Sequence, residues 1–121
     1  MSTPKSIMID DQLYVPADSK NSQAELGEYS IIRGDKFGVF MARVVDDSKA
    51  PLEIKVEDAR RLWYWDGAAS ISQLAITGVS KPSNCKFPKS VQKATLYNVC
   101  EIIPCTVEAM SSISNVKEWI S

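Results

Sequence analysis

The sequence contains no histidine at all. Without an imidazole, the chain cannot build a Ser-His-Asp or Cys-His catalytic site, a His-ligated metal centre, or the commonest general acid–base group near neutral pH. It also lacks the glycine-rich phosphate loops and the GxSxG nucleophile motif. The carboxylate pairs Asp10-Asp11, Asp46-Asp47 and Glu57-Asp58 fall at predicted strand ends or turns, where solvated acids are expected. We therefore expect a ligand-binding protein and no enzyme.

Cysteine is scarce, with only Cys85, Cys100 and Cys105 in the chain. An odd number argues against the disulfide framework of a secreted protein. The Cys100-x4-Cys105 spacing is not that of a zinc knuckle, and one further cysteine cannot complete a four-ligand site. Buried, unreactive cysteines are the better interpretation. We expect no metal and no cofactor.

An excess of basic charge is missing as well, because 14 Lys and Arg residues face 15 Asp and Glu residues. A duplex nucleic-acid binder needs a basic field to displace counterions from phosphates, so this class is excluded. Any anionic ligand must be bound by a few local arginines. Residues 1–10 have no apolar segment of the signal-peptide kind, and no run approaches the ~20 apolar residues of a membrane helix. These features predict a cytoplasmic protein with no membrane partner.

What the chain does contain is enough apolar sequence for one core, since 45% of its 121 residues are hydrophobic. In the N-terminal half, alternation predicts strands at Ile7–Val15, Tyr29–Arg33, Lys36–Val45 and Leu52–Val56. Gly34-Asp35 between the second and third of these is typical of a hairpin turn. The strands are expected to form an antiparallel meander.

The C-terminal half adds two short helices. Ser70-x-x-Gln73 has the form of a capping box, which predicts a helix from Ser70 that ends near Gly78. Thr106 is expected to cap a second helix that runs through Ile113. Between the helices, Val91–Ile103 is predicted as a strand interrupted near Asn98, and Val116–Ile120 as a closing strand. The predicted fold class is α+β.

One segment has chemical potential beyond packing. Arg60-Arg61 leads into three aromatic residues, Trp63–Trp65, and then into the small-residue turn Gly67–Ser70 before the first helix. Arginine offers a planar fork that matches phosphate oxygens, and aromatic rings offer faces for a base. A helix N-terminus offers N–H groups to phosphate. Together these features describe a nucleotide-binding site.

A packing interpretation of the same segment stays open. If the strand continues, Trp63 and Trp65 lie on one face and bury in the core, because side chains alternate along a strand. Arg60 and Arg61 then point to opposite sides, and at most one of them reaches a ligand.

The runs RRLWYWDGAASISQLA at Arg60–Ala75, NCKF at Asn84–Phe87 and EIIPCT at Glu101–Thr106 resemble a family of small phage-encoded proteins described as a domain of unknown function. The chain is also similar to the phage sponges that counter Thoeris defence. The likeness extends from Tyr29 to the C-terminus. It implies a variable N-terminal extension at residues 1–28 and a single α+β ligand-binding domain at residues 29–121.

The resemblance implies a phage immune-evasion protein of the host cytoplasm. Such sponges bind cyclic ADP-ribose signals and hold them without cleaving them, so that the downstream effector stays inactive. They form homodimers with ligand at the subunit interface, and some assemble into hexamers that also take up cyclic oligonucleotides.

By motif context, the resemblance assigns the ligand site to Arg33, Arg61, Phe87 and Asn98. The two arginines would contact the diphosphate, Phe87 would stack on adenine, and Asn98 would hydrogen-bond the base or ribose. The family's basic contact near the C-terminus has no clear counterpart, since only Lys117 lies there.

Three alternatives remain. Phe87 lies in a predicted loop and could instead anchor that loop in the core. The protein could inhibit a host defence protein through an aromatic surface at Trp63–Trp65. It could also be an enzyme that degrades the signal.

Overall fold

The computed structural model describes residues 25–120, so the predicted strand Ile7–Val15 lies outside the described part. Its five strands are β1 (Leu26–Gly34), β2 (Val39–Lys49), β3 (Glu53–Arg61), β4 (Val91–Tyr97) and β5 (Val99–Thr106). Its helices are α1 (Ile71–Thr77), the short 3-10 helix η2 (Pro82–Asn84) and α2 (Val107–Ser114). The predicted α+β class, with an antiparallel meander and two helices in the C-terminal half, is confirmed. No helix within residues 25–120 is long and apolar enough to cross a membrane.

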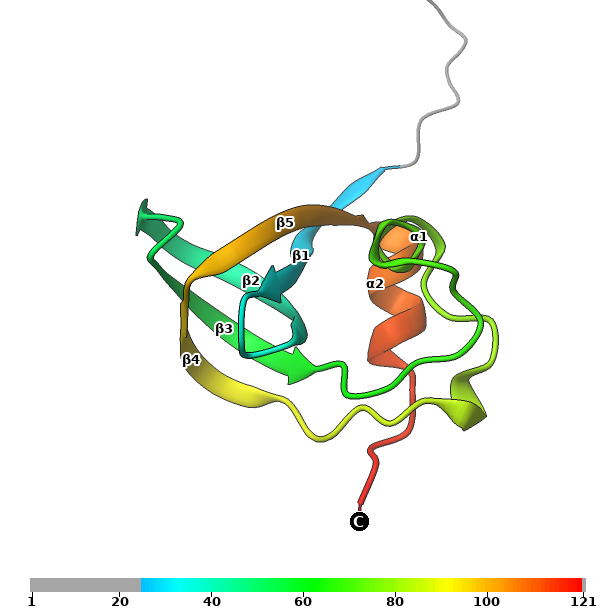
Figure 1. Ribbon diagram of the computed structural model, residues 1–121. Coiled ribbons are helices and arrows are strands. Elements are labelled where there is room, and N and C mark those ends of the chain that lie inside the picture. The colour runs from blue at the N-terminus through cyan, green and yellow to red at the C-terminus, as the bar shows by residue number, and fades with distance from the viewer. Residues whose placement is uncertain (1–24, 121) are drawn as a thin grey trace, which may run out of the picture.

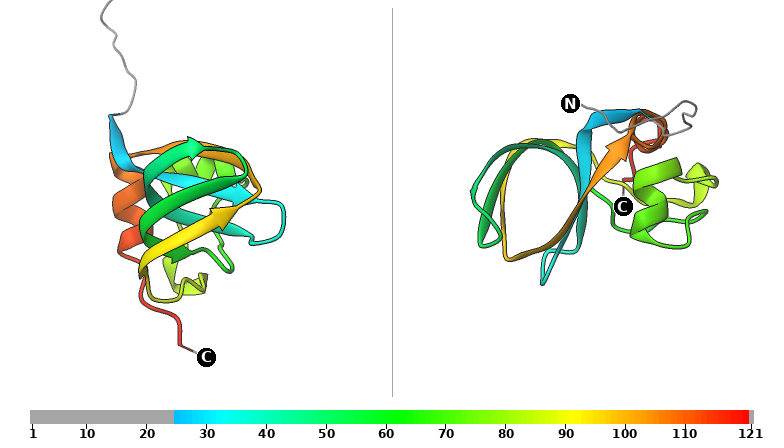
Figure 2. Two further views of the ribbon diagram at one scale, coloured as in Figure 1. Left: turned by 90° about the vertical axis from the view of Figure 1, so that its left-hand side faces the viewer. Right: turned by 90° about the horizontal axis from the view of Figure 1, so that it is seen from above.

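All neighbouring strands are antiparallel and follow the order β4-β3-β2-β1-β5. The sheet curls strongly, and the helices lie outside the curl, next to β1 and β5 (Figures 1 and 2). β4 and β5 are two halves of one strand that bends at Asn98, whose φ of 59° is left-handed. Asn98 donates its N–H to Leu52 O and accepts from Asp35 N, which holds the bend against both hairpin turns. The predicted interruption near Asn98 is confirmed.

The two faces of the curled sheet bury two separate cores. The register places Ile32, Phe40 and Arg61 side by side on β1, β2 and β3, and this row faces the inside of the curl. The next row on the outer face includes Ile31 and Arg60. The outer core fills the space under the helices with Ile31, Met41, Leu62, Leu74, Phe87, Cys105, Ala109 and Ile113. Alternation along the strands therefore assigns neighbouring residues to different cores.

Both predicted helix starts are confirmed by side-chain caps. Ser70 Oγ accepts from Gln73 N, and Thr106 Oγ1 accepts from Ala109 N. The Thr106 hydroxyl also donates to Ile76 O at 2.6 Å, which ties the start of α2 to α1. The first helix ends at Gly78, whose φ of 76° suits glycine.

Two boundaries differ from the predictions. β1 begins at Leu26 and pairs there with Thr106, so the domain starts inside the segment 1–28 that the sequence assigns to an extension. The predicted closing strand Val116–Ile120 is wrong, because only an isolated bridge between Phe87 and Glu118 forms there.

Candidate functional site

Arg61 lies at the C-terminal end of β3, directly opposite Phe40 on β2. Its guanidinium carbon is 4.4 Å from the centroid of the Phe40 ring, which is a cation–π contact. Arg61 Nη1 also donates to Phe37 O in the loop between β1 and β2. The two contacts fix the guanidinium at the open end of the curled sheet while the side chain remains partly exposed.

A pocket of about 520 Å³ opens beside this guanidinium. Three parts of the chain contribute its walls: the β1–β2 turn, the facing ends of β2 and β3, and the last residues of β4. The lining residues are Lys36, Phe37, Phe40, Arg61, Ala94, Thr95, Leu96, Tyr97 and Asn98. We call this the Arg61 pocket. Its volume is within the range of small-molecule sites.

The charge of the Arg61 pocket has one sign. Of the described residues that line it, only Lys36 and Arg61 are charged, and both are cations. Phe37, Phe40 and Tyr97 provide aromatic surface, and the Tyr97 side chain is 59% exposed. Two cationic side chains beside the exposed ring of Tyr97 suit a ligand that combines an anion with a planar base.

Asn98 completes the wall where β4 passes into β5. Its backbone N–H and C=O are both used in the bend, and its side chain is exposed. Asparagine tolerates the left-handed conformation at little cost, so the bend presents an amide group at the pocket without a glycine. Arg61 and Asn98, two of the four residues that the resemblance assigns to the ligand, thus line the same pocket.

Arg33 does not belong to this pocket. It lies opposite Val39 and Glu101, two residues after Ile31, and therefore on the outer face of the sheet. Its Nε lies 3.2 Å from Glu101 Oε1 in an exposed ion pair. Because Arg61 faces the inside of the curl, the two arginines do not meet on one ligand within a single chain.

Phe87 is a core residue, which corrects its assignment as a stacking platform. Its side chain is fully buried among the residues of the outer core. Its carbonyl oxygen is held by two donors, because Phe87 O accepts from Trp119 N and from Arg60 Nη2. A buried ring offers no face to adenine. The structure therefore fits the alternative in which Phe87 anchors its loop in the core.

Arg60 explains why Phe87 is held so firmly. The Arg60 side chain is 7% exposed and donates to the carbonyl oxygens of Pro88, Phe87, Ile113 and Val116, at 2.7 to 3.0 Å. Burial lowers the pKa of Arg60, and nearby Glu118 opposes this shift. The guanidinium therefore joins β3 to the C-terminal end of α2 and to the loop before β4.

The segment Arg60–Ser70, which the sequence suggests as one nucleotide-binding site, has its arginines, its tryptophans and its helix start in different surroundings. The strand ends at Arg61, so the alternation that would bury Trp63 stops, and Trp63 is 64% exposed. Trp65 packs against the outer core. At the start of α1, Ala69 N donates to Gln73 Oε1, and Gln73 N donates to Ser70 Oγ. These N–H groups are therefore already occupied within the chain.

Comparison with known proteins decides the family. Residues 27–113, most of the chain, match the family DUF6948. The chain belongs to DUF6948, a domain of unknown function. No curated protein and no solved structure matches it.

In this DUF6948 member, sequence reasoning missed Lys36, Phe37, Phe40 and Tyr97. Two signals pointed to them: Lys36 and Phe37 follow the hairpin turn, and Tyr97 precedes the predicted interruption at Asn98. Their convergence depends on the pairing of β2 with β3 and of β3 with β4, which local patterns do not specify.

The cysteines are free, and two of them are buried as predicted. Cys100 is exposed, which corrects the prediction for that residue. Burial raises the pKa of the Cys105 thiol to about 11. Within residues 25–120, no group of three or more Cys, Asp or Glu residues could hold a metal ion.

Proposed function

We propose that this DUF6948 protein binds and sequesters a cyclic nucleotide immune signal of the cyclic ADP-ribose type without cleaving it. In this role it would be a phage immune-evasion protein acting in the host cytoplasm. The single observation that carries the proposal is that Arg61 and Asn98, both assigned to the ligand from sequence, line one cationic and aromatic pocket.

Each wall of the Arg61 pocket has a part in this proposal. Arg61 and Lys36 would bind the diphosphate, since charge-assisted hydrogen bonds to phosphate are the strong ones. Tyr97 takes the stacking role that Phe87 cannot fill, because its ring is open to solvent. Asn98 would hydrogen-bond the base or ribose through its exposed amide.

Capture without turnover also fits the lining chemistry. Among residues 25–120, none of those that line the Arg61 pocket is an acid or a cysteine. General acid–base attack on the ligand would require a titratable group near neutral pH within hydrogen-bond reach. Lysine and arginine hold a phosphate without supplying such a base. The pocket can therefore retain an intact ligand.

The decisive experiment mixes the protein with a cyclic ADP-ribose isomer, removes free ligand, denatures the protein by heat and analyses the released compound. A sponge releases the intact ligand in stoichiometric amount. Arg61→Ala should lose capture, whereas Arg33→Ala, on the outer face and paired with Glu101, is the matched control and should keep it. Release of an altered product would establish degradation instead. Absence of any captured ligand would refute the proposal.

The proposal includes a homodimer or a hexamer. The Arg61 pocket is a surface site at one end of the curled sheet, and a partner subunit placed over it would close it around a nucleotide. Closure of this kind raises affinity by excluding water and adding contacts. Light scattering with and without ligand measures the assembly. A monomer that retains full affinity would contradict this part of the proposal.

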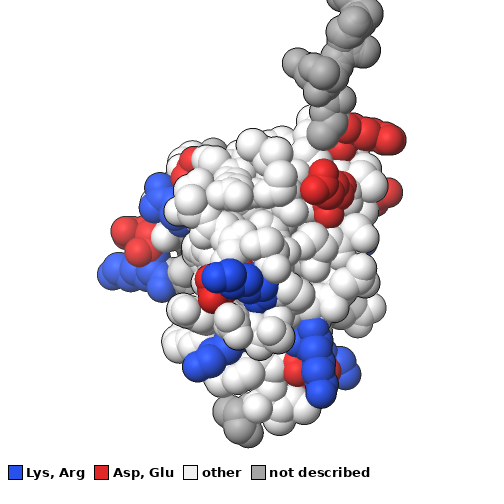
Figure 3. All heavy atoms as spheres, turned by 90° about the vertical axis from the view of Figure 1, so that its right-hand side faces the viewer, with Lys and Arg blue, Asp and Glu red and all other residues white. Residues whose placement is uncertain are grey.

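A second candidate is favoured by the exposed aromatic surface around Trp63. Trp63 and Tyr64 are 64% and 51% exposed, and Lys86 Nζ lies 6.0 Å from the centroid of the Tyr64 ring and 5.6 Å from that of Trp119. Large uncharged areas separate the few charged groups on the side of the molecule shown in Figure 3. Exposed aromatic residues of this kind are typical of protein interfaces. An inhibitor of a host defence protein would lose activity in Trp63→Ala and would release no nucleotide on heating.

A further inference from the structure

β3 contains a β-bulge next to a cavity that is separate from the Arg61 pocket. Residues Met41–Arg43 of β2 face residues Glu57–Arg60 of β3, so β3 carries one extra residue at this point. Within the bulge, Asp58 has a φ of 50°, which is the left-handed region. Non-glycine residues in this conformation, and bulges themselves, gather at functional sites, where they re-aim a side chain. Here the side chain that is re-aimed is the Asp58 carboxylate.

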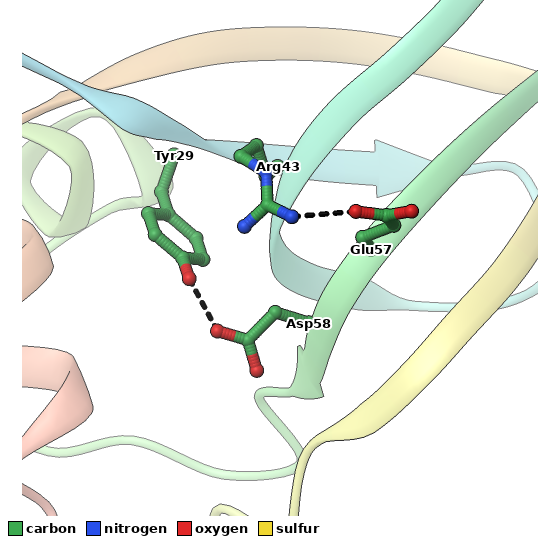
Figure 4. A network of polar contacts seen from close by, with 4 residues as sticks. All are labelled: Tyr29, Arg43, Glu57 and Asp58. Carbon is green, nitrogen blue, oxygen red and sulfur yellow. Dashed lines mark hydrogen bonds and ion pairs between the residues drawn. The ribbon is translucent and has the colours of Figure 1, made fainter.

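A polar network holds this carboxylate in place (Figure 4). Tyr29 OH donates to Asp58 Oδ2, and this hydrogen bond raises the pKa of Tyr29. Arg43 Nη2 donates to Glu57 Oε1 at 2.5 Å, and the Arg43 guanidinium lies between Glu57 and the Tyr29 ring. The second oxygen of Asp58 points away from Tyr29. One acceptor and part of one guanidinium therefore remain available to a ligand.

The adjoining cavity has a volume of about 760 Å³ and walls of both charges. Its charged lining residues are the cations Arg43, Arg60 and Lys89 and the anions Glu57, Asp58 and Glu118. Ser90, Gln92 and Ser114 add neutral polar groups. The cavity lies between β3, the start of β4 and the segment after α2, on the outer face of the sheet. It is separate from the Arg61 pocket, which shares none of its lining residues.

At least two of the six charged groups in this cavity lack an ion-pair partner within the described part of the chain. The Arg60 guanidinium donates to backbone carbonyls, and Arg43 donates one nitrogen, Nη2, to Glu57. Within residues 25–120, neither Lys89 nor Glu118 forms an ion pair. Charges of both signs are thus available to a ligand in one cavity.

We propose that this cavity binds a small zwitterion with the chemistry of a free amino acid. The Asp58 and Glu118 carboxylates hold the ammonium group, and Arg43 and Lys89 hold the carboxylate. Three carboxylates in the wall disfavour a polyanion, and the many charged groups disfavour an apolar ligand, because each would lose its hydration without a partner. A molecule with one group of each sign can pair with both the acidic and the basic side chains of the cavity.

The experiment screens the purified full chain against pools of free amino acids by saturation-transfer NMR. Any amino acid that binds is then titrated by calorimetry. Binding in the millimolar range or tighter is expected for at least one of them. The N-acetyl amide of the same amino acid, which lacks both charges, should not bind. If no free amino acid binds, or if the blocked form binds equally well, the proposal is overturned.

Asp58→Asn and Glu53→Gln form the matched pair of variants. Asparagine tolerates the left-handed conformation and can still accept from Tyr29, so the fold is retained while the negative charge is lost. We expect affinity to fall about tenfold or more in Asp58→Asn, the size of a charge-assisted contact. Glu53, at the other end of β3, is outside the cavity, and Glu53→Gln should bind as the parent does. Equal affinity of the two variants would refute the site.

This site stands independently of the Arg61 pocket. Arg61→Ala should leave amino acid binding unchanged, and Asp58→Asn should leave nucleotide capture unchanged. If Arg61→Ala abolishes amino acid binding, the zwitterion binds in the Arg61 pocket and the proposal fails.

Discussion

Arg60 and Arg61 are neighbours in the chain, yet their guanidinium groups lie on opposite faces of the sheet, one beside the Phe87 ring and the other over the Phe40 ring. Alternation along β3 separates them. Arg60 is enclosed by backbone carbonyls and serves the fold, whereas Arg61 borders a pocket and is placed to serve a ligand. Two identical side chains thus acquire different roles from a single step in register.

The two arginines should separate stability from binding. Arg60→Ala removes a buried cation from four carbonyl acceptors and should lower the free energy of unfolding by about 3 kcal/mol or more. Arg61→Ala loses one hydrogen bond and one cation–π contact, which is about 1–2 kcal/mol. Its ligand affinity should fall about tenfold to a few hundredfold. Urea unfolding and calorimetric titration provide the two measurements. The assignment of roles would be reversed if Arg60→Ala bound poorly but melted normally.

Phe87 and Tyr97 form a second contrasting pair. Phe87→Ala leaves a cavity in the outer core and should cost about 3–5 kcal/mol of folding stability. Tyr97→Ala removes an exposed ring, so its melting temperature should stay close to that of the parent. Its loss of binding should be about 1–3 kcal/mol, the usual size of a base–aromatic contact. Normal affinity of Tyr97→Ala would mean that another ring of the pocket receives the base.

Asn98 allows its backbone and side-chain contributions to be measured apart. Asn98→Gly keeps the left-handed bend and removes only the amide, so stability should change by less than about 1 kcal/mol while affinity falls. Asn98→Val should unfold more readily, because a β-branched residue at a φ of 59° is strained by about 1–2 kcal/mol. Thermal melts of both variants, with and without ligand, test this. An Asn98→Gly protein with full affinity would show that the amide makes no contact.

The cysteines predict a simple labelling pattern. Iodoacetamide should modify exposed Cys100 in the native protein and leave buried Cys85 and Cys105 intact until the chain is unfolded. Peptide mass spectrometry locates the label. Modification of Cys105 in the native state would contradict its burial.

Cys105 also predicts a dependence of stability on pH. Burial raises the pKa of the Cys105 thiol in the folded chain. At a pH below the pKa of the unfolded chain, the thiol is neutral in both states and stability has its full value. Stability should decline as pH rises from about 9 to 11, because the unfolded chain releases the proton first. Melts of the parent and of Cys105→Ala across this range, compared as a difference, isolate the effect. A difference that is constant with pH would rule it out.

Local features of this fold could be predicted from sequence, and long-range ones could not. Ser70 and Thr106 cap their helices through groups three residues away, so the signal lies within the local sequence. The contact of Arg61 with Phe40 depends on the register of two strands, and the approach of Asn98 depends on a third. Trp63 was placed by extending a strand that ends at Arg61. The apolar residues of Val116–Ile120 resembled a strand, although that segment forms only one bridge.

The strand order of the sheet has a kinetic consequence. β1 lies at the start of the described residues, but one of its two partner strands, β5, follows only about seventy residues later in the chain. The sheet is therefore completed by contacts between residues far apart in sequence. During synthesis the β1–β2–β3 hairpins can form early, while the wall contributed by Tyr97 and Asn98 is added only when β4 and β5 emerge. The Arg61 pocket is therefore incomplete until β4 and Asn98 have emerged, and a nascent chain would acquire its ligand only after that point.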